Sequence, residues 1–220
     1  MACETHFVFV TGGTGFMGRR LIASLLQRGH QVKALVRDGS QGKVPRGVEP
    51  VVGDPLSTAS IQRYVAPADT FVQLVGVAHP NPSKAAEFRM IDQTAGCAGA
   101  DAAAHCGVRH FVYVSVAQPA PVMKAYIAAR SAVETRIREL ALNATIIRPW
   151  YVLGPGRRWP ILLKPFYALL GLFSQTRAGA NRLGLITDEQ MNAALVNAVE
   201  APAEGIRFVE VPQIRQATLA

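Results

Sequence analysis

The chain has 220 residues, of which 50% are hydrophobic and 17% are charged, which is typical of a globular α/β protein and excludes a disordered or collagen-like chain. The formal net charge is +8, but lysines and arginines are scattered along the chain, which favours phosphate-bearing ligands and no nucleic-acid partner. The cysteines are Cys3, Cys97 and Cys106, an odd number without metal-ligand spacing, so we expect reduced thiols and no metal site.

The location follows from the same features. No apolar window reaches the length of a membrane-spanning helix, and no basic stretch leads into an apolar signal core near residue 1. We therefore expect a cytoplasmic protein, and peripheral contact with the inner face of the membrane stays open.

Strands and helices are expected to alternate along the first 150 residues. Apolar runs predict strands at residues 7–10, 31–36, 48–52, 70–75, 110–114 and 144–147. Amphipathic or alanine-rich stretches predict helices at residues 18–28, 57–64, 83–106 and 123–140. This alternation predicts an α/β fold with a doubly wound parallel sheet, helices on both faces and a ligand at the carboxyl ends of the strands.

Residues 8–18, with the sequence VFVTGGTGFMG, join the first strand to the first helix. Gly12, Gly15 and Gly18 fall in the turn, where residues without a Cβ let backbone N–H groups approach a pyrophosphate closely. The helix that follows adds the partial positive charge of its N-terminus. The turn therefore predicts a phosphate cradle, and the alternative is a strand–turn–helix whose glycines serve geometry alone.

Residues 151–220 differ in texture and predict a small lobe over the mouth of the sheet, serving as a substrate lid or a partner contact. A helix is expected at residues 187–200 and a short strand at residues 207–211. Residues 159–173 are strongly apolar and too short to span a membrane. They can pack in the core or over a substrate, form a homodimer or complex contact, or lie on a membrane surface through residues 157–173. An apolar substrate fits the first of these alternatives.

Taken together, the motifs resemble the short-chain dehydrogenase/reductase superfamily, in particular its extended and atypical branches. They are the glycine turn, GDP at residues 53–55, VYVS at residues 112–115, a downstream tyrosine, and RPWYVLGPG at residues 148–156. Those branches include NAD(P)-binding epimerase-like proteins and relatives of the 39 kDa subunit of respiratory complex I. The resemblance implies a Rossmann-like dinucleotide-binding domain over residues 1–150.

The resemblance also assigns cofactor contacts. Carried onto this sequence, they are Gly12, Thr14, Gly15, Phe16, Met17, Gly18, Arg37, Asp54, Pro55, Val75, Gly76, Val77, Pro149 and Trp150. Asp54 would contact the adenine ring, and Pro149 with Trp150 would lie beside the nicotinamide.

The end of the second strand bears on the choice between NADP and NAD. Arg37 offers a planar set of donors suited to the 2′-phosphate, which favours NADP. The alternative is a solvated Arg37 with Asp38 binding the ribose hydroxyls of NAD.

Active members of the superfamily use a serine, a tyrosine and a lysine one helical turn after the tyrosine. Here Ser115 follows the fifth strand, Tyr126 opens the next helix, and Arg130 stands where the lysine is usual. Tyr126 and Arg130 share a helix face, so the arginine can supply a fixed positive charge, but it cannot relay a proton. Two hypotheses stay open: an NADP-dependent oxidoreductase or epimerase-like enzyme, and a non-catalytic dinucleotide-binding sensor or assembly partner of a membrane-associated complex.

Overall fold

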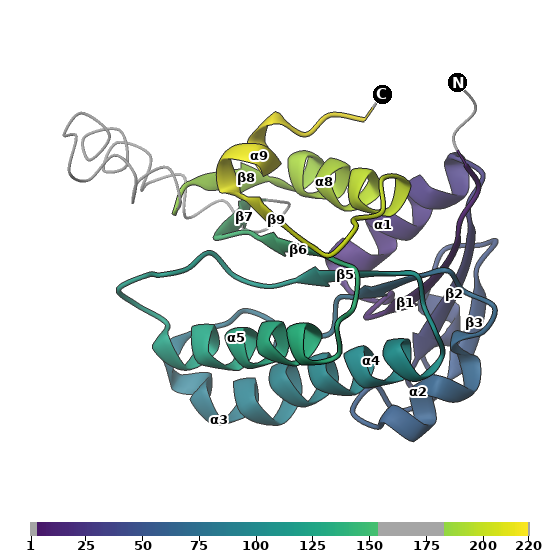
Figure 1. Cartoon of the computed structure of the whole chain (residues 1–220), viewed down its shortest axis with the longest axis horizontal. Helices are drawn as coiled ribbons and strands as arrows, with labels where there is room; N and C mark the ends of the chain where they lie inside the picture. Colours follow the sequence, from purple (N-terminus) through teal and green to yellow (C-terminus); the bar gives the residue numbers. More distant parts are fainter. Residues whose placement is uncertain (1–3, 154–182, 220) are drawn as a thin grey trace.

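Seven parallel strands form the centre of the molecule, with helices on both faces (Figure 1). The computed structural model describes residues 4–153 and 183–219. The order of the strands in the sheet is β3-β2-β1-β4-β5-β6-β9. The strands are β1 (Phe7–Thr11), β2 (Gln31–Val36), β3 (Glu49–Val52), β4 (Thr70–Gln73), β5 (His110–Val114), β6 (Ala144–Arg148) and β9 (Ile206–Glu210).

Two layers of helices enclose the sheet: α1 and α8 cover one face, and α2, α4 and α5 cover the other (Figure 1). The longer helices are α1 (Phe16–Gln27), α2 (Thr58–Val65), α4 (Thr94–His105), α5 (Lys124–Glu139) and α8 (Asp188–Glu200). Short helical segments are η1 (Gln41–Lys43), η2 (Pro82–Lys84), α3 (Ala85–Glu87), η3 (Phe88–Gln93) and α9 (Val211–Gln216). The predicted doubly wound parallel sheet is therefore confirmed.

The central strands are buried on both sides, which is why they read as continuous apolar runs rather than alternating ones. Phe9, Phe71 and Phe111 lie on adjacent strands, with ring centroids 5.1 and 5.2 Å apart between neighbours. On the same face, α4 packs closely against α5. A Cβ at Gly96 would lie only 2.5 Å from a methyl group of Val133 on α5, so there is no room for a side chain at this position. Glycine at this position thus lets α5 lie close to α4.

The predicted helix at residues 83–106 is not continuous. It is divided into η2, α3, η3 and α4, and η3 is a π-helix. A π-helix changes which residues face inward, and apolar periodicity does not reveal such a change. As a result Asp92 of η3 is fully buried.

The described part of residues 151–220 contributes to the main body. Strand β9 pairs with β6 at the edge of the sheet, and α8 packs on α1. Two further strands, β7 (Tyr151–Leu153) and β8 (Leu185–Thr187), form a separate parallel pair. The predicted division at residue 150 stays a prediction, and the apolar segment 159–173 lies outside the described residues.

Helices α2 and α8 begin at the caps that the sequence suggests. Ser57 caps α2 by accepting a hydrogen bond from Ser60 N at 3.3 Å. Thr187 caps α8 in a reciprocal arrangement with Gln190, a capping box that satisfies two backbone N–H groups.

Among residues 4–153 and 183–219, no helix is long and apolar enough to cross a membrane.

Candidate functional site

The carboxyl ends of the parallel strands meet at one edge of the sheet. Strand β1 lies between β2 and β4, so the chain leaves β1 toward one side and crosses back to β4 on the other. In open α/β sheets, ligands bind in the crevice outside such a change of direction. The turns after β1 and β4 are therefore where a ligand site is expected.

The glycine turn after β1 is packed too tightly for side chains. Gly12 has a φ of +76°, and a Cβ there would lie 2.8 Å from the carbonyl carbon of Leu74 and 2.9 Å from the nitrogen of Val75. A Cβ at Gly18 would lie 2.7 Å from the Cα of Gly13. The turns after β1 and β4 thus approach each other closely, and the start of α1 rests directly on the turn.

Helix α1 presents its N-terminus at this edge. Its N-cap is Gly15, which offers no side-chain cap, and its first turn contains no acidic residue. The first backbone N–H groups of a helix lack intrahelical partners, and the helix dipole places partial positive charge there. The predicted contact residues Thr14, Phe16 and Met17 flank this point. The donors and the glycine cradle fit a pyrophosphate group.

The loops after β2 and β3 carry the residues that we predict near the adenosine end of the cofactor. Arg37 is exposed, whereas one oxygen of Asp38 accepts a hydrogen bond from the N–H of Gly39 at 2.9 Å. After β3, the Asp54 carboxylate accepts from the N–H of Leu56 at 2.9 Å. Both carboxylates thus stabilise their own turns. Pro55 follows Asp54 in that turn.

The guanidinium of Arg130 is buried below the turn after β4. Its Nη1 donates to the carbonyl of Val114 at 2.7 Å, and its Nη2 donates to the carboxylate of Asp92, which is fully buried. There is no room for a Cβ at Gly76, because Arg130 Nη2 and Asp92 Oδ1 fill that space. The second Asp92 oxygen accepts from the N–H of Val77 at 3.1 Å. The exposed glycine after β4 therefore covers a buried ion pair.

Charge and burial act against each other in this pair. Burial raises the pKa of Asp92 above its usual range, although Arg130 and the Val77 N–H oppose that rise. Burial alone would lower the pKa of Arg130, but Tyr126, Tyr113 and Asp92 more than reverse it, so that its pKa is raised. Arg130 therefore keeps its positive charge inside the protein.

Tyr126 and Arg130 come together as their spacing on one helix face predicts. The guanidinium carbon of Arg130 lies 5.1 Å from the centroid of the Tyr126 ring. The centroid of the Phe88 ring of η3 lies 4.9 Å from the centroid of the Tyr126 ring. The tyrosine is half-buried and contacts both an aromatic ring and a fixed cation.

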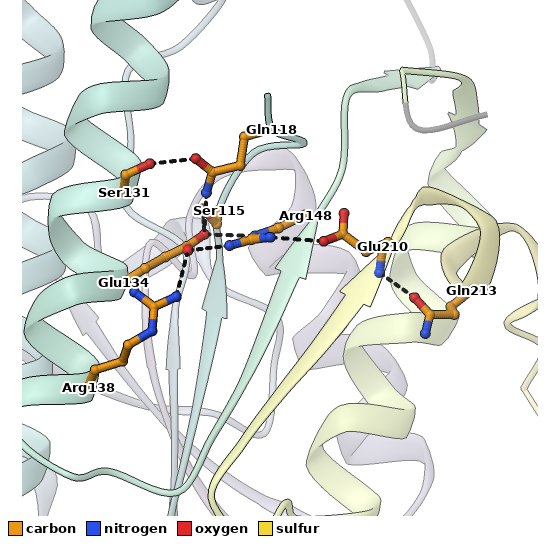
Figure 2. A network of polar contacts seen from close by, with 8 residues as sticks. All are labelled: Ser115, Gln118, Ser131, Glu134, Arg138, Arg148, Glu210 and Gln213. Atoms are coloured by element: carbon orange, nitrogen blue, oxygen red, sulfur yellow. Dashed lines mark hydrogen bonds and ion pairs between the residues drawn. The ribbon is translucent and has the colours of Figure 1, made fainter. Parts of the chain in front are cut away.

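Ser115 belongs to a different polar network, centred on Glu134 of α5 (Figure 2). The buried hydroxyl of Ser115 donates to Glu134 Oε1 at 2.6 Å, and Gln118 Nε2 donates to the same oxygen at 3.1 Å. The guanidinium of Arg148 donates to both Glu134 oxygens and, at 2.9 Å, to Glu210 of β9. This network joins α5 to the ends of β5, β6 and β9, and its catalytic use of Ser115 stays a prediction.

The remaining predicted residues lie at the same edge. Pro149 and Trp150 follow β6, and the carbonyl of Pro149 accepts from the N–H of Ala117 at 2.9 Å. Val75 follows β4 and contacts the glycine turn as described above. The contacts of each predicted residue with a cofactor stay predictions, because geometry at the sheet edge shows their position and not their ligand.

Sequence reasoning missed three charged residues that organise this region: Asp92, Glu134 and Arg148. No local pattern sets Asp92 apart from Glu87 and Asp101 in the same predicted helix, so the sequence carries no signal for its burial. Within residues 4–153 and 183–219, no cluster of histidine, cysteine and carboxylate side chains could hold a metal ion.

Comparison with known proteins places the chain in a family. The family described as NAD(P)H-binding matches residues 12–158. A ceramide reductase of Caulobacter vibrioides is 30% identical over 214 residues, which cover 95% of this chain and 65% of the relative. A 4-hydroxy-2-methyl-3-oxo-4-farnesyl-3,4-dihydroquinoline-1-oxide ketoreductase of Stigmatella aurantiaca is 25% identical, covering 66% of this chain and 50% of the relative. The chain thus spans about two thirds or less of these relatives.

Solved structures agree on the fold. The Bordetella bronchiseptica enzyme WbmH, in complex with NAD+, superposes with a TM-score of 0.69 at 19% identity, covering 94% of this chain and 75% of that chain. A UDP-N-acetylglucosamine 4-epimerase from Bacillus cereus gives a TM-score of 0.67 at 16% identity, covering 94% and 76% of the two chains. The chain belongs to the NAD(P)H-binding family, and its fold is the one that these solved structures share.

Proposed function

We propose that this protein is an NADP-dependent reductase that acts on a carbonyl group of an apolar, lipid-like substrate. The observation that carries the proposal is the Tyr126–Arg130 pair, held by Asp92 directly below the turn after β4. Two relatives support the substrate class, since one is named a ceramide reductase and the other a ketoreductase of a farnesylated quinoline.

In this proposal, each group of the chain has a definite task. NADPH, when bound at the glycine turn, supplies the hydride. Tyr126 donates its hydroxyl proton to the carbonyl oxygen, and the fixed charge of Arg130 stabilises the negative charge that the donation leaves on the tyrosine. Ser115 positions the end of β5 through Glu134; a catalytic role would require its hydroxyl to leave that carboxylate.

A second candidate function is a dinucleotide-binding protein without turnover. The commitment of Arg130 to Asp92 and Val114 favours it, because an arginine held in this way cannot deprotonate to relay a proton. The two candidates differ in one measurable step. The reductase oxidises bound NADPH when a ketone is added, whereas the binding protein leaves it reduced.

Tyr126→Phe tests the reductase directly. Loss of a positioned proton donor costs about 100-fold or more in the rate, so kcat/KM for NADPH oxidation falls by at least that factor while NADPH binding is kept. The assay uses the ketone form of ceramide and methyl undecyl ketone in detergent micelles, followed by NADPH absorbance. Tyr64→Phe on α2 is the matched control and keeps wild-type turnover. Equal rates in wild-type protein and Tyr126→Phe would refute the assignment.

Arg37→Ala tests the choice of cofactor. A charged hydrogen bond to the 2′-phosphate is worth about 1.5–3 kcal/mol, so the Kd for NADPH rises about 10-fold or more while the Kd for NADH stays the same. Fluorescence of the bound dinucleotide reports both constants. Arg63→Ala, which removes an exposed arginine of α2, is the control and changes neither. If NADH binds more tightly than NADPH to the wild-type protein, the cofactor is NAD.

A further inference from the structure

We propose that Asp92 is a positioning residue that joins the cofactor-binding turn after β4 to the Tyr126–Arg130 pair. The role of Tyr126 in this inference rests on the proposed function. The role of the turn rests only on the membership of the chain in the NAD(P)H-binding family. Asp92 touches no substrate or cofactor; it acts through Arg130 and through the backbone of Val77.

The two oxygens of Asp92 face different parts of the site. Oδ1 accepts from Arg130 Nη2, and Oδ2 accepts from the Val77 N–H at 3.1 Å. The side chain of Asp92 is fully buried, so water does not compete for either oxygen. A buried carboxylate that accepts from a charged donor at one oxygen and from a backbone N–H at the other fixes the distance between the two donors.

The turn itself depends on this arrangement. Gly76 is exposed on its outer side, and its inner side rests on Arg130 Nη2 and Asp92 Oδ1 with no space for a side chain. The path of the backbone after β4 is therefore defined from below by the ion pair. A displacement of the ion pair moves the turn, and with it the surface on which we expect the dinucleotide to lie.

Segment η3 supplies both contacts. Phe88 and Asp92 are four residues apart and are both buried, and so they face the site together. Tyr126 and Arg130 are also four residues apart on α5, and the two pairs meet: Phe88 against Tyr126 and Asp92 against Arg130. The two helices thus hold the tyrosine and its cation as one unit.

The test is the dinucleotide affinity of Asp92→Asn. An asparagine keeps the shape but has a single acceptor oxygen for two donors, so either Arg130 or the Val77 N–H loses its partner. We expect the Kd for NADPH, measured by fluorescence, to rise about 10-fold or more, in line with the loss of a buried hydrogen bond to a charged group. Asp101→Asn is the matched control, because Asp101 also links α4 to an arginine of α5, Arg136, at 2.8 Å. Its Kd should stay within about twofold of wild type.

The outcomes separate a positioning role from a merely structural one. Equal Kd values for Asp92→Asn and Asp101→Asn, with both proteins folded by circular dichroism, would overturn the inference. If Asp92→Asn does not fold, Arg130→Gln and the double variant Asp92→Asn/Arg130→Gln, which removes both charges, replace it in the titration. The inference then predicts that Arg130→Gln raises the Kd for NADPH. The double variant should bind NADPH no more weakly than Arg130→Gln alone, since the two residues act as one unit. Wild-type binding in the double variant would overturn it.

These measurements also separate the inference from the proposed function. Dinucleotide binding needs no substrate and no turnover, so the Kd values test Asp92 even if wild-type protein reduces no ketone. Failure of turnover alone would contradict the reductase, and an unchanged Kd alone would contradict the role of Asp92.

Discussion

Burial makes single residues decisive in this protein. Arg130 is 5% exposed and its charge is matched by Asp92 and the carbonyl of Val114, so each of the three groups depends on the others. Removing one partner of such a pair leaves an uncompensated charge away from water, which costs more than the pair contributes when intact. The buried charge of Arg130 is therefore accompanied by the opposite charge of Asp92.

His110, the first residue of strand β5, shows the same effect of burial at the amino end of the strands. Burial, assisted by Arg207, lowers the pKa of His110 from 6.5 to about 4, and its Nε2 lies 3.0 Å from Thr145 Oγ1. Between these two pH values the unfolded chain binds a proton that the folded chain does not. Stability is therefore full above about pH 6.5 and is lost as the pH falls toward 4.

We predict that His110→Gln removes part of this acid sensitivity. At pH 5 the wild-type protein should have lost about 2 kcal/mol more of its pH 7 free energy of unfolding than the variant has. Urea titrations of both proteins at pH 7 and pH 5 measure the difference. His105→Gln, at an exposed position on α4, should behave like wild type. An equal pH dependence in His110→Gln and wild type would show that His110 is not the group responsible.

At the scale of elements, the turn between β1 and α1 is packed tightly against its neighbours. Three chain segments meet there without room for a Cβ: the turn itself, the start of α1, and the turn after β4. Close packing of backbones is what allows backbone N–H groups to reach a phosphate. The glycines thus serve the packing and the proposed ligand together.

We predict that Gly18→Ala disturbs both. The new Cβ would lie 2.7 Å from the Cα of Gly13, so that α1 must move away from the turn. Overpacking of this kind costs about 1–3 kcal/mol of stability, and we expect the Kd for NADPH to rise about 10-fold or more as the helix N-terminus moves. Thermal unfolding and dinucleotide fluorescence measure the two effects. Gly42→Ala is the control, because a Cβ there meets open space. Unchanged binding in Gly18→Ala would mean that the phosphate does not lie at this turn.

The sequence predicted the features that depend on local pattern. Apolar runs specify the strands, the glycine turn specifies the start of α1, and Ser57 and Thr187 specify the starts of α2 and α8. Each of these signals lies within a few residues of the element that it specifies. Asp92 could not be placed in this way, because its partner Arg130 is 38 residues away and η3 interrupts the expected periodicity. Tertiary partners of buried charges are the part that local pattern does not contain.

Ser115 illustrates the same limit in the predicted site. The resemblance implies a substrate-orienting hydroxyl at this position, but the direction of the hydroxyl depends on Glu134, 19 residues further along the chain. The position was therefore predictable and the partner was not. The preference for NADP over NAD is likewise inferred from a single position, Arg37 after β2, and it stays a prediction.

Across the whole molecule, the sheet brings the ends of six successive strands to one edge, and the predicted site residues follow those ends. The strands alternate with helices over most of the chain, and the NAD(P)H-binding family matches residues 12–158. Residues that are more than 100 positions apart, such as Gly12 and Trp150, thereby fall on the same edge. Our proposal of a dinucleotide site with the Tyr126–Arg130 pair beside it accounts for this arrangement.

The most direct test of this account follows the hydride. Wild-type protein is incubated with NADPH deuterated at the transferred position and the ketone form of ceramide, and the alcohol product is analysed by mass spectrometry. We predict one deuterium at the former carbonyl carbon of the product, with the yield reduced about 100-fold or more in Tyr126→Phe. A wild-type protein that binds NADPH tightly but transfers no deuterium to this ketone or to methyl undecyl ketone would contradict the account.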